Sequence, residues 1–283
     1  MPAHPAIAAG RTAVVTGGAS GIGLAAAKRF ARLGLNIAIA DLDAARLDAA
    51  AAEIKAAGAP DVLTISLDVS RREDVERLKE RVYGVFGDVG ILMNNAGTGG
   101  GGGPFENYEG WQRVLGTNLW GVINGVQVFA PAMIAQGTPA AIVNTGSKQG
   151  ITTPPGDTAY NVSKAGVKVV TEGLQHVLRN TEGCKVSAHL LVPGWVHTGL
   201  TARSASPKPA GAWWPDQIVD VLIERMGKGD FYIVCPDNEV TSAIDNKRIA
   251  WAAGDITENR PPLSRWHPAY KDAFSAFLKK DGG

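Results

Sequence analysis

The stretch TAVVTGGASGIGLAAAKRFARL, residues 12–33, decides how the chain folds. Its first five residues form an apolar run typical of a buried strand, and the pattern from Leu24 to Leu33 is typical of a helix. In the turn between them, Gly17 permits a tight bend, Gly21 lets the backbone approach a pyrophosphate, and Gly23 lets the helix pack close to the strand. Phosphates would lie at the helix N-terminus, where free N–H groups and the helix dipole favour anions. The stretch therefore predicts a dinucleotide site.

The next apolar run, Asn36–Ala40, ends at an acid that bears on the choice of dinucleotide. Asp41 comes 18 residues after Gly23, close to the spacing expected for a contact to the adenosine ribose. Its carboxylate can accept both ribose hydrogen bonds and would repel a 2′-phosphate, and the glycine turn contains no Arg or Lys. This favours NAD over NADP. The alternative is that Asp41 only caps the helix Ala44–Ala57, which Asp43 could do equally well.

Strand-like and helix-like segments alternate at least five times along the chain. This alternation predicts an α/β fold, with a parallel sheet covered by helices on both faces and joined by right-handed crossovers. We find no internal repeat and no domain boundary, so residues 1–283 are expected to form a single domain. Its core would span about 10–235, and 236–283 would be a polar extension with one helix at Pro268–Lys279, packed on the core or on a neighbouring subunit. The expected strands are Thr12–Thr16, Asn36–Ala40, Val62–Leu67, Gly90–Met93, Ala140–Asn144, Lys185–Leu191 and Phe231–Val234.

The stretch from Ser147 to Lys164 holds the residues that could carry chemistry. Ser147 follows the buried strand Ala140–Asn144, and a Pro-Pro-Gly break comes before a new helix. Tyr160 and Lys164 are four residues apart on that helix and share a face. A hydroxyl, a phenol and an ammonium would then converge at the carboxyl edge of the sheet, where open α/β folds bind ligands.

Such a trio is suited to proton transfer. A free phenol has a pKa of about 10, and moving it to about 7 needs roughly 4 kcal/mol of preference for phenolate. The Lys164 ammonium, helped by a nicotinamide cation, could supply this preference in a dry site. Tyr160 would then take the proton of an alcohol while Ser147 holds the substrate oxygen. The alternative is that Tyr160 only packs and Lys164 is a solvated charge.

Composition excludes several other classes of protein. The chain has 283 residues, 45% hydrophobic and 19% charged, with a net charge of +1, so nothing draws nucleic acid or an acidic membrane surface. Two cysteines make no disulfide framework. No segment is judged long and apolar enough to span a bilayer, and residues 1–10 do not read as a secretory signal. We therefore expect a cytosolic protein without a membrane or nucleic-acid partner and without a metal ion.

Taken together, these motifs resemble the classical short-chain dehydrogenase/reductase family. The pattern Thr16-Gly17-x-x-x-Gly21-x-Gly23 comes first, and the other family motifs follow in family order over roughly residues 10–235, with 13 residues from Ser147 to Tyr160. These other motifs are Asn94-Asn95-Ala96-Gly97, Asn118, Ser147, Tyr160-x-x-x-Lys164, and Pro193-Gly194 with Thr198.

The resemblance implies a Rossmann-like doubly wound sheet of about seven strands and an oxidoreductase that uses a nicotinamide cofactor. Tyr160 would be the acid/base, Ser147 would orient the substrate oxygen, and Lys164 would hold the nicotinamide ribose and lower the Tyr160 pKa. Asn118 would anchor a water that relays protons through Lys164. Homotetramers or homodimers are usual in the family. By position, the cofactor would contact Gly17, Ser20, Gly21, Ile22, Gly23, Asp41, Asp68, Val69, Asn95, Gly97, Tyr160, Lys164, Pro193, Gly194, Val196 and Thr198.

Three features depart from the family pattern. Lys148 follows Ser147 where a small residue is more usual, five glycines run from Gly99 to Gly103, and the tail beyond Val234 is long. The glycine run is either a mobile loop beside the site or a flexible linker. The Ser/Pro/Ala/Gly-rich loop Thr201–Ala212 precedes two tryptophans. Candidates to contact substrate are Gln149, Trp195, Trp213 and Trp214, with Phe105, although the tryptophans could equally fill the core or a subunit interface.

The sequence thus favours an NAD-dependent dehydrogenase of secondary alcohols, or a ketone reductase, with a bulky or aromatic substrate. The alternative is a regulatory protein that binds NAD(H) and has lost turnover. The intact Ser147, Tyr160 and Lys164 argue against that alternative. An epimerase or dehydratase acting on a nucleotide sugar would need a larger C-terminal domain than the roughly 90 residues that follow Pro193.

Overall fold

The computed structural model describes residues 3–201 and 207–279, so part of the loop Thr201–Ala212 lies outside the described residues. Its centre is a seven-stranded parallel sheet in the order β3-β2-β1-β4-β5-β6-β7. This confirms the predicted doubly wound fold, and the order reverses between β1 and β4. The strands are β1 Thr12–Thr16, β2 Asn36–Asp41, β3 Val62–Ser66, β4 Ile91–Asn94, β5 Ala140–Thr145, β6 Val186–Val192 and β7 Tyr232–Val234.

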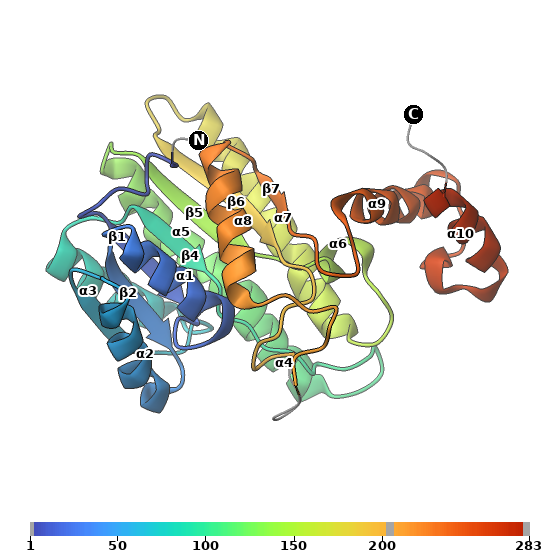
Figure 1. The fold of residues 1–283 in the computed structure, drawn as a ribbon, viewed down its shortest axis with the longest axis horizontal. Helices are drawn as coiled ribbons and strands as arrows, with labels where there is room; N and C mark the ends of the chain where they lie inside the picture. The colour runs from blue at the N-terminus through green and yellow to red at the C-terminus, as the bar shows by residue number, and fades with distance from the viewer. Residues whose placement is uncertain (1–2, 202–206, 280–283) are drawn as a thin grey trace.

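Helices cover both faces of the sheet (Figure 1). On one face α1, α2 and α8 enclose a core that includes Phe30, Ile54 and Leu222, and on the other face α3, α5 and α7 enclose a core that includes Phe129 and Leu178. Because both faces are buried, the central strands are continuous apolar runs rather than alternating ones. The bounds are α1 Gly21–Arg32, α2 Ala44–Ala56, α3 Arg72–Phe86, α5 Gly121–Ala135, α7 Thr158–Asn180 and α8 Pro215–Gly227.

The segment Tyr108–Ala135 corrects one expectation about membranes. Helix α4 (Tyr108–Leu115), the π-helical turn η1 (Gly116–Trp120) and α5 run on as 28 residues, and the most apolar 18-residue window of this segment has a mean hydropathy of 1.2, long and apolar enough by composition to cross a bilayer. Half of its most apolar window is buried inside the protein, where α5 packs against α3 and β4. The apolarity is accounted for by burial in the core.

The C-terminal extension contains more structure than the sequence predicted. Helix α9 (Ser242–Thr257) is additional, and the helix expected at Pro268–Lys279 is a 3₁₀ turn, η3 (Pro268–Tyr270), followed by α10 (Lys271–Lys279). The two helices pack together through Trp251, whose ring lies 5.2 Å from those of Phe274 and Phe277. They lie to one side of the core, with α9 next to the short helix α6 (Gln149–Thr152) (Figure 1).

Candidate active site

A cleft of about 370 Å³ opens at the carboxyl ends of the central strands. This is the edge at which ligands bind in open parallel sheets, at the point where the strand order reverses. Nearly all the residues predicted to bind cofactor, together with three of the four predicted catalytic residues, line it. These are Gly17, Ser20, Gly21, Ile22, Asp41, Asp68, Val69, Asn95, Gly97, Ser147, Tyr160, Lys164, Pro193, Gly194, Val196 and Thr198.

The glycine turn at one end of the cleft has the shape needed for a pyrophosphate. Gly17 and Gly21 have φ of +64° and +54°, a conformation that side chains disfavour. A Cβ on Gly23 would lie 2.1 Å from the Gly17 carbonyl oxygen, so this glycine lets α1 begin directly against the turn. Ser20 caps α1 without a side-chain hydrogen bond, and the first turn carries no acid, which leaves the N-terminus suited to an anion.

Asp41 lies where β2 ends and is held rigidly. One carboxylate oxygen accepts a hydrogen bond from the Ala19 amide at 3.1 Å, and the other accepts one from the Asp43 amide at 3.2 Å. The alternative role as a helix cap belongs to Asp43, whose side chain accepts from the Ala45 amide. Asp41 therefore presents a fixed negative charge beside the glycine turn, where an adenosine ribose would lie.

Hydrogen bonds between side chains and backbone groups hold the middle part of the cleft. Asp68 accepts a hydrogen bond from the Ser70 amide at 2.9 Å, and the Val69 carbonyl accepts one from the Asn124 side chain at 2.9 Å. Asn95 donates to the Thr16 carbonyl at 3.1 Å and so joins the end of β4 to the end of β1. These hydrogen bonds hold the strand ends that line the middle of the cleft in place.

At the other end of the cleft, the predicted trio of Ser147, Tyr160 and Lys164 comes together. Asp157 caps α7 by accepting a hydrogen bond from the Tyr160 amide at 3.1 Å, which fixes the position of the tyrosine in the first turn of the helix. The Ser147 hydroxyl hydrogen-bonds the phenol of Tyr160. The Lys164 ammonium lies 5.7 Å from the centre of the Tyr160 ring and donates to the Thr145 carbonyl at 2.8 Å.

Burial controls the pKa values of both titratable members of this trio. It raises the pKa of Tyr160, which the Ser147 hydrogen bond lowers in part and the Asp157 charge raises further. It also lowers the pKa of Lys164 to about 8. Lys164 was expected to lower the Tyr160 pKa. In the protein chain without cofactor the effect of burial is larger, and the pKa of Tyr160 is raised. A second positive charge would be needed to favour the phenolate.

Asn118 lies behind the trio, fully buried, in the π-helical turn η1. Its side chain accepts the Thr98 amide at 2.7 Å and donates to the Thr98 carbonyl at 2.9 Å and to the Ser163 hydroxyl at 3.1 Å. It does not line the cleft. A π turn is common at functional sites because it re-aims side chains within a helix. The Thr98 contacts make Asn118 a brace of the loop after β4, and its predicted role in a water relay stays a prediction.

Comparison with known proteins agrees with this geometry. The family model described as short chain dehydrogenase matches residues 11–209. The chain belongs to the short-chain dehydrogenase family. It is 35% identical over 267 residues to 1-deoxy-11-beta-hydroxypentalenate dehydrogenase of Streptomyces exfoliatus, covering 92% of this chain and 95% of the relative. The protein is accordingly an oxidoreductase with a Rossmann-like fold.

Two solved structures of the family differ in the cofactor with which they form a complex. A short-chain dehydrogenase/reductase from Burkholderia phymatum in complex with NAD has a TM-score of 0.80 and 33% identity, covering 90% of this chain and 96% of that one. A metagenomic short-chain oxidoreductase in complex with NADP has a TM-score of 0.68 and 28% identity, covering 81% and 98%. The fold thus serves a nicotinamide dinucleotide of either kind.

The glycine run Gly99–Gly103 is held by hydrogen bonds, which the sequence did not indicate. Asp157 accepts the Gly100 amide at 2.9 Å and the Gly101 amide at 3.3 Å, while Asn107 donates to the Gly100 carbonyl at 3.0 Å. A Cβ on Gly101 would lie 2.4 Å from the Ala159 Cβ, so the run packs closely on the start of α7. The same carboxylate caps Tyr160, which identifies Asp157 as a site residue that sequence reasoning missed.

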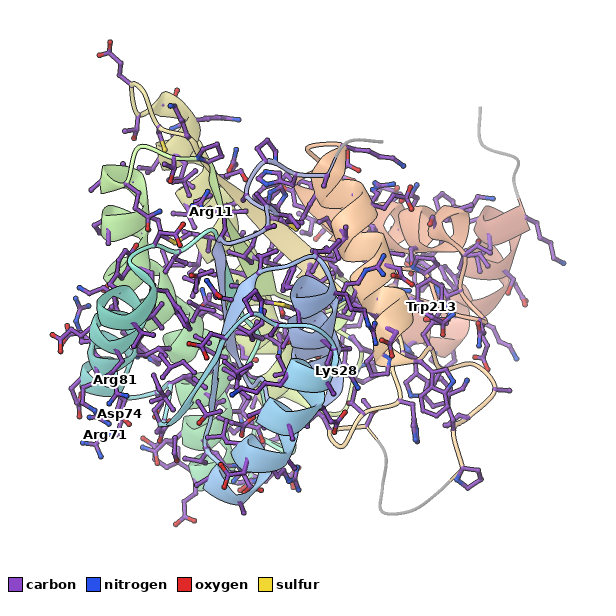
Figure 2. All side chains as sticks on the ribbon, turned by 60° about the vertical axis from the view of Figure 1, so that its left-hand side comes forward. Arg11, Lys28, Arg71, Asp74, Arg81 and Trp213 are labelled. Carbon is purple, nitrogen blue, oxygen red and sulfur yellow. The ribbon has the colours of Figure 1, made fainter. Side chains whose placement is uncertain are left out.

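The candidate substrate residues do not line the cleft. Trp195 and Trp214 are 43% and 51% exposed, Phe105 is fully exposed, and Gln149 is exposed on α6. Trp213, beside the start of α8, packs against the core and donates to the Asn238 side chain (Figure 2). The cleft is lined instead by Arg113, Thr117, Leu200 and Thr201, which no sequence motif marked.

Proposed function

We propose that this protein is an NAD(H)-dependent dehydrogenase of a bulky, apolar secondary alcohol, or a reductase of the corresponding ketone. The observation that supports this most is the convergence of the Ser147 hydroxyl, the Tyr160 phenol and the Lys164 ammonium at the end of the cleft opposite Asp41. One end of the cleft is suited to proton transfer, and the other is suited to the adenosine of an unphosphorylated dinucleotide.

Tyr160 exchanges the proton in this proposal. With the substrate hydroxyl held by Ser147, the phenolate of Tyr160 takes its proton as the alcohol is oxidised and returns it in the reverse direction. When bound, the nicotinamide dinucleotide accepts or supplies the hydride and, in its oxidised form, adds a positive charge near the phenol. Lys164, anchored on the Thr145 carbonyl, contributes a second cation from the helix that carries Tyr160. The two cations together oppose the effect of burial on the Tyr160 pKa.

Asp41 supports the choice of NAD. Its two oxygens are already oriented by backbone amides, so the carboxylate accepts ribose hydroxyls without reorganisation, whereas a 2′-phosphate would meet a fixed like charge. The neighbouring Leu42 is 73% exposed and offers no cation to a phosphate. The similar protein from Burkholderia phymatum was solved in complex with NAD.

Among the residues that line the cleft, Leu200 favours an apolar substrate. Leu200 is 52% exposed and lines the cleft, and a Cβ on Gly99 would lie 3.6 Å from its Cδ1, so the leucine faces the glycine run. A relative named for the dehydrogenation of a hydroxypentalenate matches nearly the whole chain. Both observations favour a bulky alicyclic or aromatic alcohol over a sugar phosphate, because the exposed surface of Leu200 does not satisfy hydroxyls or phosphates.

The test is a nicotinamide absorbance assay on a panel of bulky secondary alcohols and ketones, with NAD(H) and NADP(H) compared. We expect turnover with NAD(H), reduced about 10²–10⁴-fold in Tyr160→Phe, which keeps the ring but cannot carry the proton. Undiminished activity in Tyr160→Phe would refute the mechanism. NADH binding without turnover on any substrate would instead support the regulatory alternative.

A further inference from the structure

Lys148, the residue that departs from the family pattern beside Ser147, is enclosed by acids from two distant parts of the chain. Its ammonium lies 2.6 Å from a carboxylate oxygen of Asp245, in the first turn of α9, and 3.3 Å from one of Asp237, in the loop after β7. The Lys148 side chain is 19% exposed, and those of Asp237 and Asp245 are 7% and 5% exposed. This is a buried charge cluster and not a solvated surface lysine.

Asp237 connects the cluster to the turn after β6. Its Oδ2 atom, which contacts Lys148, also accepts the Trp195 amide at 3.3 Å, and its Oδ1 accepts the Val240 amide at 2.8 Å. A Cβ on Gly194 would lie 2.8 Å from that Oδ2 and 3.0 Å from the Lys148 ammonium. The Pro193–Gly194 turn, which lines the cleft, therefore rests directly on the Lys148–Asp237 pair.

Asp245 connects the same ammonium to the C-terminal extension. Burial raises the pKa of the Asp245 carboxyl, and Lys148 is the strongest of the groups that oppose this rise, with Arg248 one turn further along α9 adding a weaker attraction. Helix α9 contacts α6, the short helix that follows Lys148. The first turn of α9 is thus held to the segment of the catalytic serine by one buried ion pair.

We propose that Lys148 is a positioning residue that fastens three parts of the protein together. These are the Ser147 segment, the Pro193–Trp195 turn on the nicotinamide side of the cleft, and the extension that begins with α9. The lysine touches neither reacting group, and it acts by setting the spacing between Ser147 and that turn. Its catalytic consequence rests on the proposed function, whereas the mechanical link does not.

The experiment compares Lys148→Met, Asp245→Asn and the double variant with wild type, in the full chain. Lys28→Met is the matched control, because Lys28 also bridges two elements, by a 2.7 Å ion pair with Glu53, and does not line the cleft. Amide hydrogen exchange is followed in residues 193–197 and 242–257. NADH binding is followed by fluorescence, and kcat and KM are measured across pH on the best substrate.

In Lys148→Met we expect exchange to rise at least about tenfold in both segments, because removing one partner leaves two buried carboxylates without their cation. NADH affinity should fall several-fold, and kcat should fall about 10- to 100-fold, the range produced by misplacing a reacting group by about 1 Å. The acid limb of the pH profile should stay in place, because Lys148 is not among the charges that shift the Tyr160 pKa. The double variant should lose no more kcat than Lys148→Met alone, since both changes break one unit.

Several results would overturn the proposal. One is wild-type exchange in 193–197 together with a kcat/KM within about twofold of wild type in Lys148→Met. A second is faster amide exchange in 242–257 with wild-type exchange in 193–197, which would mean that the lysine only holds the extension. A third is a double variant whose loss of kcat equals the product of the losses in the two single variants. If Lys148→Met does not fold, Asp245→Asn carries the same exchange test from the α9 side. If no alcohol is turned over but exchange rises in both segments, the link stands and the dehydrogenase proposal fails.

Discussion

Replacing Lys164 by methionine should separate what the lysine does for catalysis from what it does to stability. The side chain is 4% exposed, and burial lowers its pKa from 10.5 to about 8. Methionine has a similar length and no charge. The variant should lose most activity, because the cation beside Tyr160 disappears. It should nevertheless be at least nearly as stable as wild type near pH 7.

The magnitude follows from the two pKa values of Lys164. A difference of about 2.5 between the folded and unfolded values corresponds to about 3 kcal/mol. Below pH 8 the lysine is protonated in both states, and its buried charge destabilises the folded protein by about that amount. Between pH 8 and 10.5 the unfolded chain binds more protons, so the free energy of unfolding of wild type rises with pH. Against this, the variant leaves the Thr145 carbonyl without its donor, at a cost of about 1–3 kcal/mol.

The assay is urea unfolding of cofactor-free wild type and Lys164→Met at intervals from pH 7 to pH 10. The stability of wild type relative to the variant should increase by about 2–3 kcal/mol over that range, most of it above pH 8. The lost hydrogen bond is the same at every pH and does not enter this slope, and other titrating groups are common to both proteins. Parallel profiles for the two proteins would show that Lys164 does not carry a depressed pKa, and the reasoning would fail.

Three further predictions rest on other groups. Burial and the neighbouring His189 lower the pKa of His4 from 6.5 to about 4, so the unfolded chain binds more protons than the folded one between these pH values. The free energy of unfolding of wild type should therefore fall by up to about 3 kcal/mol from pH 6.5 to pH 4. His4→Gln should lose less over the same range, as measured by urea unfolding. Asp41→Ala should weaken NADH binding about 10- to 100-fold by fluorescence while leaving NADPH binding equal or tighter, and an equal loss for both would remove Asp41 from the ribose site. In Asp157→Asn the acid limb of the kcat/KM profile should move to lower pH, since the Asp157 charge raises the Tyr160 pKa; an upward move would contradict this.

The fold and most of the residues that line the cleft could be predicted because their determinants are local. A glycine turn between a strand and a helix needs only its own residues, and Tyr160 and Lys164 share a helix face whatever surrounds them. Residues that follow parallel strands must also meet at one edge of the sheet. All the predicted strands were confirmed to within one or two residues at each end.

The features that could not be predicted depend on contacts between distant residues. The glycine run is ordered by Asp157, which is 57 residues from Gly100, and no local pattern indicates such a partner. In helix α9 the buried residues are Asp245, Trp251 and Gly254, and only the tryptophan is a large apolar residue. The sequence of the helix therefore lacks the apolar stripe that would have predicted it. From the sequence, tryptophans such as Trp214 were candidates to line the substrate site, but Trp214 is exposed outside the cleft. The sequence does not show on which side of a loop an aromatic ring lies.

Charged residues next to the candidate catalytic ones explain how the loops around the cleft keep their shape. Lys148 directly follows Ser147 and holds the turn at Gly194, while Asp157 lies three residues before Tyr160 and holds the glycine run. A glycine run does not fix its own conformation, and the segment at Gly194 rests on side chains that are distant in the sequence. Each is instead tied to a backbone segment that carries one of the two candidate reacting hydroxyls, Ser147 or Tyr160. Changes in a loop that keep its tie should therefore alter substrate choice, whereas changes to Lys148 or Asp157 should reduce the rate for every substrate.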